Sequence, residues 1–211
     1  MSRMFRTLEG TFLDRRGRAR FIAHNFADHL RGRVLDVGCG DALLREHVTD
    51  YVGCDIAGKP DVRLNLDHAF LPFRDGSFQT AVCTDVLEHV EPMRQVFGEL
   101  FRVAQRSVII SLPNVYALGY RIKFARGRVI SKEYSLEPRN RHRWLPNFDE
   151  TCAVIRRWLP AGWEIAAEFA YYPQAWWRRG PLYAAWAHKD PNLFATSYWG
   201  LFVRRPGETP R

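Results

Sequence analysis

Residues 33–42 read RVLDVGCGDA, and this stretch decides the fold. The short apolar run 33–37 is stopped by Gly38 and Gly40, and apolar residues resume directly afterwards. A run of this kind predicts a buried parallel strand that enters a tight turn, followed by a helix over 41–48. Glycine has no Cβ, so the backbone here can turn sharply and approach a ligand closely.

Strand and helix patterns alternate outward from this turn. We expect a helix before it, over 19–30, and a helix opened by Pro92 after it, because apolar residues recur there with the helical period. The strands expected after the first are 51–56, 62–66, 78–84, 107–112, 163–171 and 197–203. Asn147 and Glu150 predict the start of a helix over 148–159. Because no clear helix pattern separates the last two strands, we predict an α/β, Rossmann-like, doubly wound seven-stranded sheet, mostly parallel with an antiparallel edge hairpin.

The glycine turn favours a cofactor without phosphates. A dinucleotide fingerprint needs a small residue five positions after its first glycine, and Leu43 stands there. Asp41 would also place a carboxylate beside a pyrophosphate at the start of the following helix. The sequence therefore argues against binding of the NAD type.

Four motifs in order resemble the class I S-adenosylmethionine (SAM)-dependent methyltransferases, of the methyltransferase-11 or MetW-like type. They are the glycine motif 36–42, Asp55 at the end of the second strand, Asp67, and the segments 75–78 and 85–90. The resemblance spans residues 30–114. Gln79 departs from it, since the family usually has Asp there, but this position is structural. The resemblance implies SAM as cofactor, with Asp55 on the ribose hydroxyls and Asp67 near the adenine amino group. The implied cofactor-binding residues are Asp36, Gly38, Cys39, Gly40, Asp55, Ile56, Asp67, His68 and Thr84.

Methyl transfer from a sulfonium is an in-line displacement, so the protein mainly aligns the acceptor and excludes water. A hydroxyl acceptor must also lose a proton, which a general base assists. The candidates are His142, His89 and Asp85, with His142 preferred because neighbouring arginines keep an imidazole neutral. Asp85, Glu88 and the histidines are compatible with a divalent ion such as Mg²⁺. No ligand spacing marks one, and we predict no metal.

The second half of the chain is expected to recognise the acceptor. Residues 106–211 carry 17 Lys and Arg against 8 Asp and Glu, whereas residues 1–105 carry 14 against 15. We predict one methyltransferase domain over 1–211, with substrate-side insertions at 115–146 and 172–196. Tryptophan faces can stack on sugar rings, so we favour O-methylation of a small polar acceptor, a saccharide first. The tryptophans in these segments are Trp144, Trp176, Trp177 and Trp186.

Two alternatives remain open. The basic stretch 121–143 could track RNA phosphates, although no base-methylating tetrapeptide accompanies it, and RNA is therefore not favoured. The other alternative is a MetW-like SAM-binding subunit that has no catalytic activity of its own. No apolar run is long enough to span a membrane, no secretory signal is present, and the four cysteines form no CxxC pair. These features predict reduced thiols and a cytoplasmic location without a membrane span.

Overall fold

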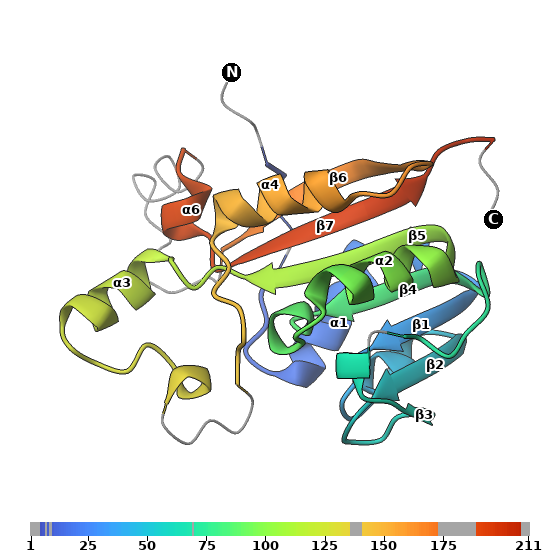
Figure 1. The fold of residues 1–211 in the computed structure, drawn as a ribbon, viewed down its shortest axis with the longest axis horizontal. Helices are drawn as coiled ribbons and strands as arrows, with labels where there is room; N and C mark the ends of the chain where they lie inside the picture. Colours follow the sequence, from blue (N-terminus) through green and yellow to red (C-terminus); the bar gives the residue numbers. More distant parts are fainter. Residues whose placement is uncertain are drawn as a thin grey trace.

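A computed structural model of the chain describes residues 5–6, 8, 10–68, 70–135, 141–172 and 189–207. Its centre is one seven-stranded sheet with the order β3-β2-β1-β4-β5-β7-β6 (Figure 1). The strands are β1 Arg33–Val37, β2 Asp50–Asp55, β3 Val62–Arg63, β4 Phe78–Thr84, β5 Ala104–Pro113, β6 Trp163–Tyr171 and β7 Ser197–Arg204. β1 to β5 pair in parallel, whereas β7 pairs antiparallel with both β5 and β6. The predicted mixed sheet and its antiparallel edge are confirmed.

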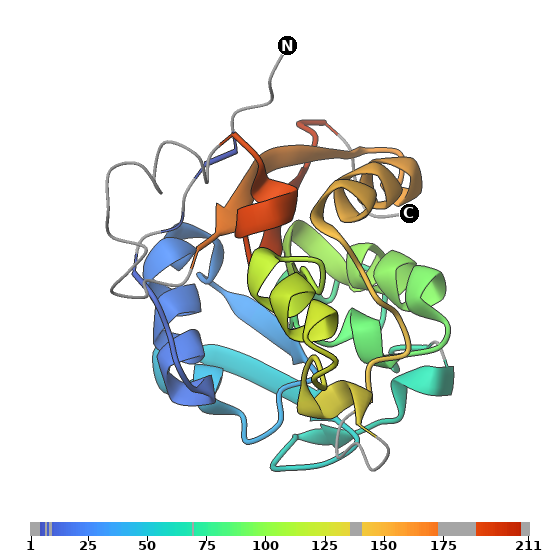
Figure 2. The ribbon, with the colours of Figure 1, turned by 90° about the vertical axis from the view of Figure 1, so that its left-hand side faces the viewer.

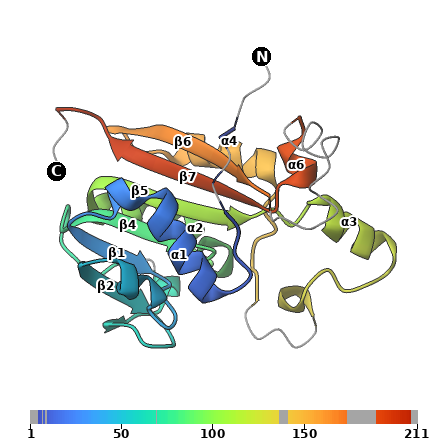
Figure 3. The same cartoon turned by 180° about the vertical axis from the view of Figure 1, so that it is seen from behind.

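Helices cover both faces of this sheet. Figure 1 shows α2 and α4 on one face, and Figure 3 shows α1 on the other. The α-helices are α1 Arg15–Asn25, α2 Met93–Val103, α3 Leu118–Ala125, α4 Phe148–Trp158 and α6 Pro191–Phe194. The 3₁₀ turns are η1 Ala27–His29, η2 Leu43–His47, η3 Leu66–His68, η4 Leu87–His89 and η5 Lys132–Tyr134. No helix in the described ranges combines the length and the apolarity that crossing a membrane requires.

The strand sequences explain why both faces are covered. Successive side chains of a strand point to opposite faces, so an apolar run buries both. In β1, Leu35 and Val37 join the hydrophobic cluster under α2 and α4, whereas Val34 joins the cluster under α1. In β5, Val108 and Ile109 divide in the same way, and all of these side chains are fully buried. The central strands are therefore held by apolar packing on both faces, and their polar residues lie at the strand ends.

Three local details differ from expectation, and the predicted starts of α2 and α4 agree with it. The helix expected over 41–48 is the 3₁₀ turn Leu43–His47, because Ala42 before it has a left-handed backbone with φ of 55°. The third strand has only two residues. β5 begins at Ala104, directly at the end of α2, and Pro92 precedes its helix as the cap. The cap of α4 is confirmed, since the Asn147 side chain accepts a hydrogen bond from the Glu150 N–H.

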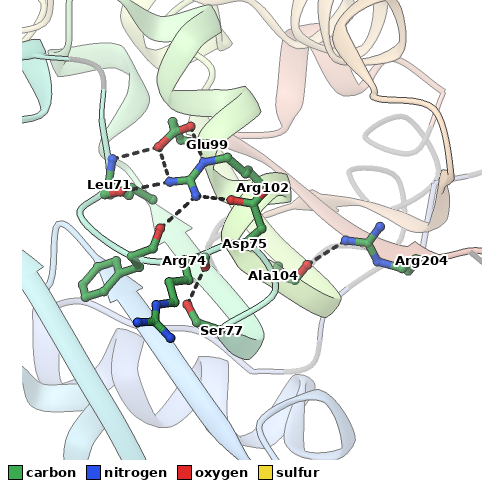
Figure 4. Close-up of polar contacts among 9 residues, drawn as sticks. Leu71, Arg74, Asp75, Ser77, Glu99, Arg102, Ala104 and Arg204 are labelled. Atoms are coloured by element: carbon green, nitrogen blue, oxygen red, sulfur yellow. Dashed lines mark hydrogen bonds and ion pairs between the residues drawn. The ribbon is translucent and has the colours of Figure 1, made fainter. Parts of the chain in front are cut away.

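One arginine ties the loop before β4 to α2, as Figure 4 shows. The Arg102 guanidinium pairs with Glu99 at 2.6 Å and with Asp75 at 2.6 Å. It also donates to the carbonyl oxygens of Leu71 and Phe73. The planar fork of arginine allows several such bonds at once. This contact fixes the chain that leads from η3 to β4.

The segment after β5 lies beyond the carboxyl ends of the parallel strands. Figure 2 looks onto this end of the sheet, with α3 and the chain through η5 in front of it. In doubly wound sheets, ligands bind in the crevice outside the carboxyl ends of the strands. The functional site is therefore expected between these strand ends and residues 115–146.

Candidate active site

A cavity of about 1430 Å³ opens at the carboxyl ends of β1, β2 and β4. Its strand-end wall is formed by Asp36, Gly38, Cys39, Gly40, Asp55, Ile56, Asp67, Thr84 and Asp85. Its opposite wall includes Tyr120, Ser131, Glu133, Tyr134, Arg141, His142 and Arg143, all from the segment after β5. Of the predicted cofactor-binding residues, His68 alone is not in the lining, and its side chain is exposed.

The glycine turn approaches its neighbours too closely for a side chain. Gly38 has φ of 76°, and a Cβ there would lie 2.2 Å from Cγ2 of Val86. A Cβ on Gly58, in the loop after β2, would lie 2.1 Å from the carbonyl oxygen of Gly40. That oxygen accepts a hydrogen bond from the Lys59 N–H at 2.7 Å. The two loops therefore form one rigid floor of the cavity.

Asp55 is fixed at the end of β2 by backbone donors. Its Oδ2 accepts from the Gly40 N–H at 2.7 Å, and its Oδ1 accepts from the Ala57 N–H at 2.9 Å. A carboxylate oxygen has two lone pairs, so each oxygen can still accept a further bond. The carboxylate is thus held in place with capacity for two hydroxyl donors, as the predicted ribose contact requires.

Asp36 lies deeper, at the bottom of the same wall. Its carboxylate accepts a hydrogen bond from the Tyr51 hydroxyl at 2.8 Å, and only 8% of the residue is exposed. Burial raises the pKa of Asp36 to about 6, against the opposing effect of the Tyr51 hydrogen bond. Asp36 is therefore a carboxylate that a nearby cation would stabilise.

Asp67 joins the two walls. Its Oδ2 accepts from Arg143 at 2.8 Å, and its Oδ1 accepts from the Glu91 N–H at 3.1 Å. Arg143 also pairs with the Glu91 side chain at 3.2 Å. All three residues line the cavity, and the side chains of Asp67 and Arg143 are partly exposed. Asp67, the predicted adenine contact, is therefore ion-paired with Arg143 of the acceptor-side segment.

Asp85 is fully engaged within the protein. Its Oδ2 pairs with Arg18 of α1 at 2.5 Å, and its Oδ1 accepts from the Ser111 hydroxyl at 2.7 Å. Its backbone is left-handed, with φ of 53°, which is strained for a residue other than glycine. Each of its two carboxylate oxygens already accepts a hydrogen bond from a neighbouring side chain. The geometry therefore disfavours Asp85 among the three candidate bases.

The other two candidates meet across the cavity. The rings of His89 and His142 lie edge to face with centroids 4.4 Å apart, although 52 residues separate them in the chain. His142 Nδ1 lies 2.7 Å from the Tyr134 hydroxyl, and His89 Nδ1 lies 3.0 Å from the Arg141 carbonyl oxygen. Burial, followed by the proximity of His89, lowers the pKa of His142 to about 4. His142 is therefore a neutral imidazole near pH 7.

Glu88, between Asp85 and His89, is almost completely buried. Its Oε2 has no hydrogen-bond partner among the described residues. Burial and the nearby Asp85 raise the pKa of Glu88 well above its ordinary value. The backbone carbonyl of Glu88 accepts from the Arg143 N–H at 2.8 Å, which anchors the acceptor-side segment to η4.

Sequence reasoning missed Arg18, Tyr134 and Arg143 as cavity residues. Arg18 precedes the motif region, and Tyr134 and Arg143 follow it, so no motif pointed to them. Glu88 was already named from the sequence, together with Asp85 and the histidines, as compatible with a divalent ion. Trp144 was expected to offer a stacking surface, but it lines a separate apolar cavity of about 390 Å³ with Trp158. Trp176, Trp177 and Trp186 lie outside the described residues.

Comparisons with known proteins show the family and the fold of the chain. Residues 11–165 match the family model described as a methyltransferase domain (Methyltransf_23). A SAM-dependent methyltransferase structure from Archaeoglobus fulgidus superposes with a TM-score of 0.59 at 16% identity, covering 90% of this chain and 94% of that one. The magnesium protoporphyrin IX methyltransferase of Synechocystis, solved with S-adenosylhomocysteine (SAH) bound, gives 0.53 at 19% identity, with coverages of 93% and 90%.

A curated relative has a much shorter match. The sterol 24-C-methyltransferase of Schizosaccharomyces pombe is 26% identical over 104 residues, which is 39% of this chain and 28% of that protein. The structural neighbours establish the fold, and the family model covers most of the chain, including the glycine turn, Asp55, Asp67 and His142. The chain therefore belongs to the methyltransferase-domain family and is a class I SAM-dependent methyltransferase.

Proposed function

We propose that this enzyme transfers the methyl group of SAM to a hydroxyl oxygen of a small polar acceptor, with saccharides as the first class to test. The observation that carries the proposal is the pair His89 and His142 in the cavity wall, with His142 neutral. A hydroxyl oxygen that attacks the methyl carbon has to lose its proton, and a neutral imidazole beside the acceptor can receive it. The histidine pair is suited to receive such a hydroxyl.

The remaining acceptor-side lining supports a polar ligand. Tyr120, Ser131, Glu133 and Tyr134 bring hydroxyl and carboxylate groups to this wall. The hydroxyls can donate and accept hydrogen bonds and the carboxylate accepts them, which fits an acceptor with several hydroxyls. As part of the proposal, residues 30–114 form the SAM-binding core of a single domain over 1–211, with substrate-side insertions at 115–146 and 172–196. The four cysteines, all within the described residues, form no disulfide and three of them are buried, which supports the cytoplasm as the location.

The test is transfer of a labelled methyl group from SAM to a panel of neutral, phosphorylated and lipid-linked saccharides. We expect a labelled product from at least one class, and no product from the analogue that lacks the methylated hydroxyl. His142→Ala should lower kcat by about 10²–10⁴-fold while SAH binding is kept. His47→Ala, an exposed histidine on η2, is the matched control and should leave kcat unchanged. No transfer across the panel, or transfer to the deoxy analogue, would refute the proposal.

RNA is the second candidate acceptor, because α3 and the residues after it carry exposed basic side chains. Residues 121–129 are all exposed and include Arg121, Lys123, Arg126 and Arg128. Phosphate contacts of this kind release counterions, so the affinity for mixed RNA should fall steeply as salt is raised. Weak binding that does not change with salt would remove RNA from consideration.

A further inference from the structure

Glu88, His89 and His142 form a cluster of side chains typical of metal ligands. Each offers one ligand atom, and these atoms all lie within 4.8 Å of one another. The Glu88 Oε1 and the His89 Nε2 are 3.8 Å apart. Metal bonds of about 2.0–2.2 Å place neighbouring ligand atoms at about 3–4 Å from each other, so this separation needs little adjustment. All three residues also line the large cavity.

The buried carboxyl of Glu88 points independently to a missing ligand. Only 1% of Glu88 is exposed, and its Oε2 has no hydrogen-bond partner among the described residues. A buried polar atom without a partner is destabilising, so such atoms are rare unless a ligand or ion completes them. A cation in front of this oxygen would supply the missing interaction.

The hydrogen bonds behind both histidines fit metal ligation. A carbonyl oxygen can only accept, so the Arg141 carbonyl places the proton of neutral His89 on Nδ1. The lone pair of His89 is then on Nε2, the atom that faces Glu88. The His142 Nδ1 lies 2.7 Å from the Tyr134 hydroxyl, which can accept a hydrogen bond from it and so leave the lone pair on Nε2. Metal-binding histidines almost always have such a partner on the other ring nitrogen, because it fixes the tautomer and the orientation.

We propose that Glu88, His89 and His142 bind one divalent first-row transition metal ion, of the class of Zn²⁺, Mn²⁺ or Fe²⁺. Two imidazole nitrogens and one carboxylate oxygen suit these ions better than Mg²⁺ or Ca²⁺, which prefer ligand sets made only of oxygen. Three protein ligands leave coordination positions open, as in catalytic metal sites. Asp85 is outside the cluster, because Arg18 and Ser111 hold its carboxylate.

Metal binding itself does not depend on the hydroxyl acceptor proposed above, but its catalytic use does. An ion bound here would place its open positions in the cavity that is expected to receive the acceptor. Coordination of a hydroxyl oxygen lowers its pKa, so the ion would make that hydroxyl easier to deprotonate. The histidines would then act as ligands and not as free bases.

The test is calorimetric titration of EDTA-treated enzyme with Zn²⁺ or Mn²⁺ alone, without acceptor, together with the absorption spectrum on adding Co²⁺. We expect one ion per chain. Glu88→Gln and His142→Ala should weaken binding at least about 100-fold, and Tyr134→Phe about 10–100-fold through the lost partner of His142. SAH binding, measured on each variant, shows that the variant is folded.

The matched controls are His47→Ala and Glu164→Gln, since both residues are exposed and lie outside the cavity. They should bind the ion as tightly as the parent enzyme. The proposal is overturned if the parent enzyme takes up no ion, or if Glu88→Gln and His142→Ala bind it unchanged. If Glu88→Gln does not bind SAH, it is not correctly folded. The ion affinities of His142→Ala and Tyr134→Phe then decide whether the proposal holds. Because the readout is ion binding, a silent saccharide panel would refute the acceptor proposal and leave the metal site standing.

Discussion

Three aspartates of the SAM motifs lie in one cavity but in different electrostatic surroundings. Asp36 is buried with a raised pKa, Asp55 is held by backbone N–H groups, and Asp67 is paired with Arg143. Their spacing in the sequence shows that they meet at the strand ends, because parallel strands end at the same edge. Their different surroundings depend on residues that the motifs do not contain, Tyr51 and Arg143 among them.

Asp55→Ala should weaken SAH binding by about 10²–10⁴-fold. The substitution removes two charge-assisted acceptors for the ribose, each worth about 1.5–3 kcal/mol, and frees the Gly40 N–H that the carboxylate now holds. Isothermal titration of SAH measures the change. Asp55→Asn, which keeps one acceptor oxygen, should lose less. Equal affinity for the parent and for Asp55→Ala would show that the ribose contact lies elsewhere.

Asp36→Asn should stabilise the cofactor-free protein relative to the parent, and increasingly so as pH rises from about 4 to 6. The pKa of Asp36 is raised by burial from 3.8 to about 6. A raised carboxyl pKa means that the folded state holds the proton more tightly, so the parent loses stability as pH rises through this window. The full difference is about 3 kcal/mol. Urea unfolding at several pH values measures it, and a difference that does not vary with pH would contradict the expectation.

At the scale of elements, α2 is coupled to the cofactor half through the loop before β4. Arg102 on α2 holds the carbonyl oxygens of Leu71 and Phe73, so the loop that follows η3 and Asp67 is tied to a helix (Figure 4). The amphipathic pattern of α2 predicted the helix and its buried face. It did not predict this contact, because the arginine contacts a loop whose conformation no periodic pattern describes.

Arg102→Met should destabilise the protein by about 2–3 kcal/mol. It leaves Glu99 and Asp75 without their cation and two carbonyl oxygens without their donor. Arg74→Met, at an exposed position in the same loop, should change stability by less than about 0.5 kcal/mol. Chemical unfolding of both variants gives the comparison. Similar losses for the two would mean that the Arg102 contacts contribute little.

At the scale of the whole molecule, the features that were predictable are those that a short stretch of sequence determines. The alternation of strands and helices, the glycine turn and the antiparallel edge all come from runs of a few residues, and the structure confirms them. The site is different, since Glu88 meets His142 from 54 residues away and Asp67 meets Arg143 from 76. Which loop folds over the strand ends depends on packing after β5, where no short-range pattern constrains the chain. The donor side was therefore predictable and the acceptor side was not.

The last strand, β7, contributes side chains to the hydrophobic clusters on both faces of the sheet. β7 lies between β5 and β6, with Trp199 in the cluster under α1 and Phe202 in the cluster under α2 and α4. Trp199→Ala and Phe202→Ala should each cost about 3–5 kcal/mol, because both side chains are fully buried.

Because one strand serves both clusters, thermal unfolding of either variant should remain a single transition that follows both sides of the sheet. Circular dichroism and hydrogen exchange of residues in α1 and α2 measure this. Unfolding of one face before the other would contradict the expectation. An alanine at the exposed Tyr116 is the control and should leave the midpoint nearly unchanged.

The ion pair between Arg143 and Asp67 has a consequence for the timing of turnover. It connects the acceptor-side segment to the residue expected beside adenine, and both partners are partly exposed at the cavity. Ion pairs with exposed partners weaken as salt is added. SAH that leaves the cavity along this side must pass the ion pair between Asp67 and Arg143, and Arg143 belongs to the acceptor wall. Added salt should therefore shorten the residence time of SAH, so that the segment that selects the acceptor also sets how quickly the spent donor is exchanged.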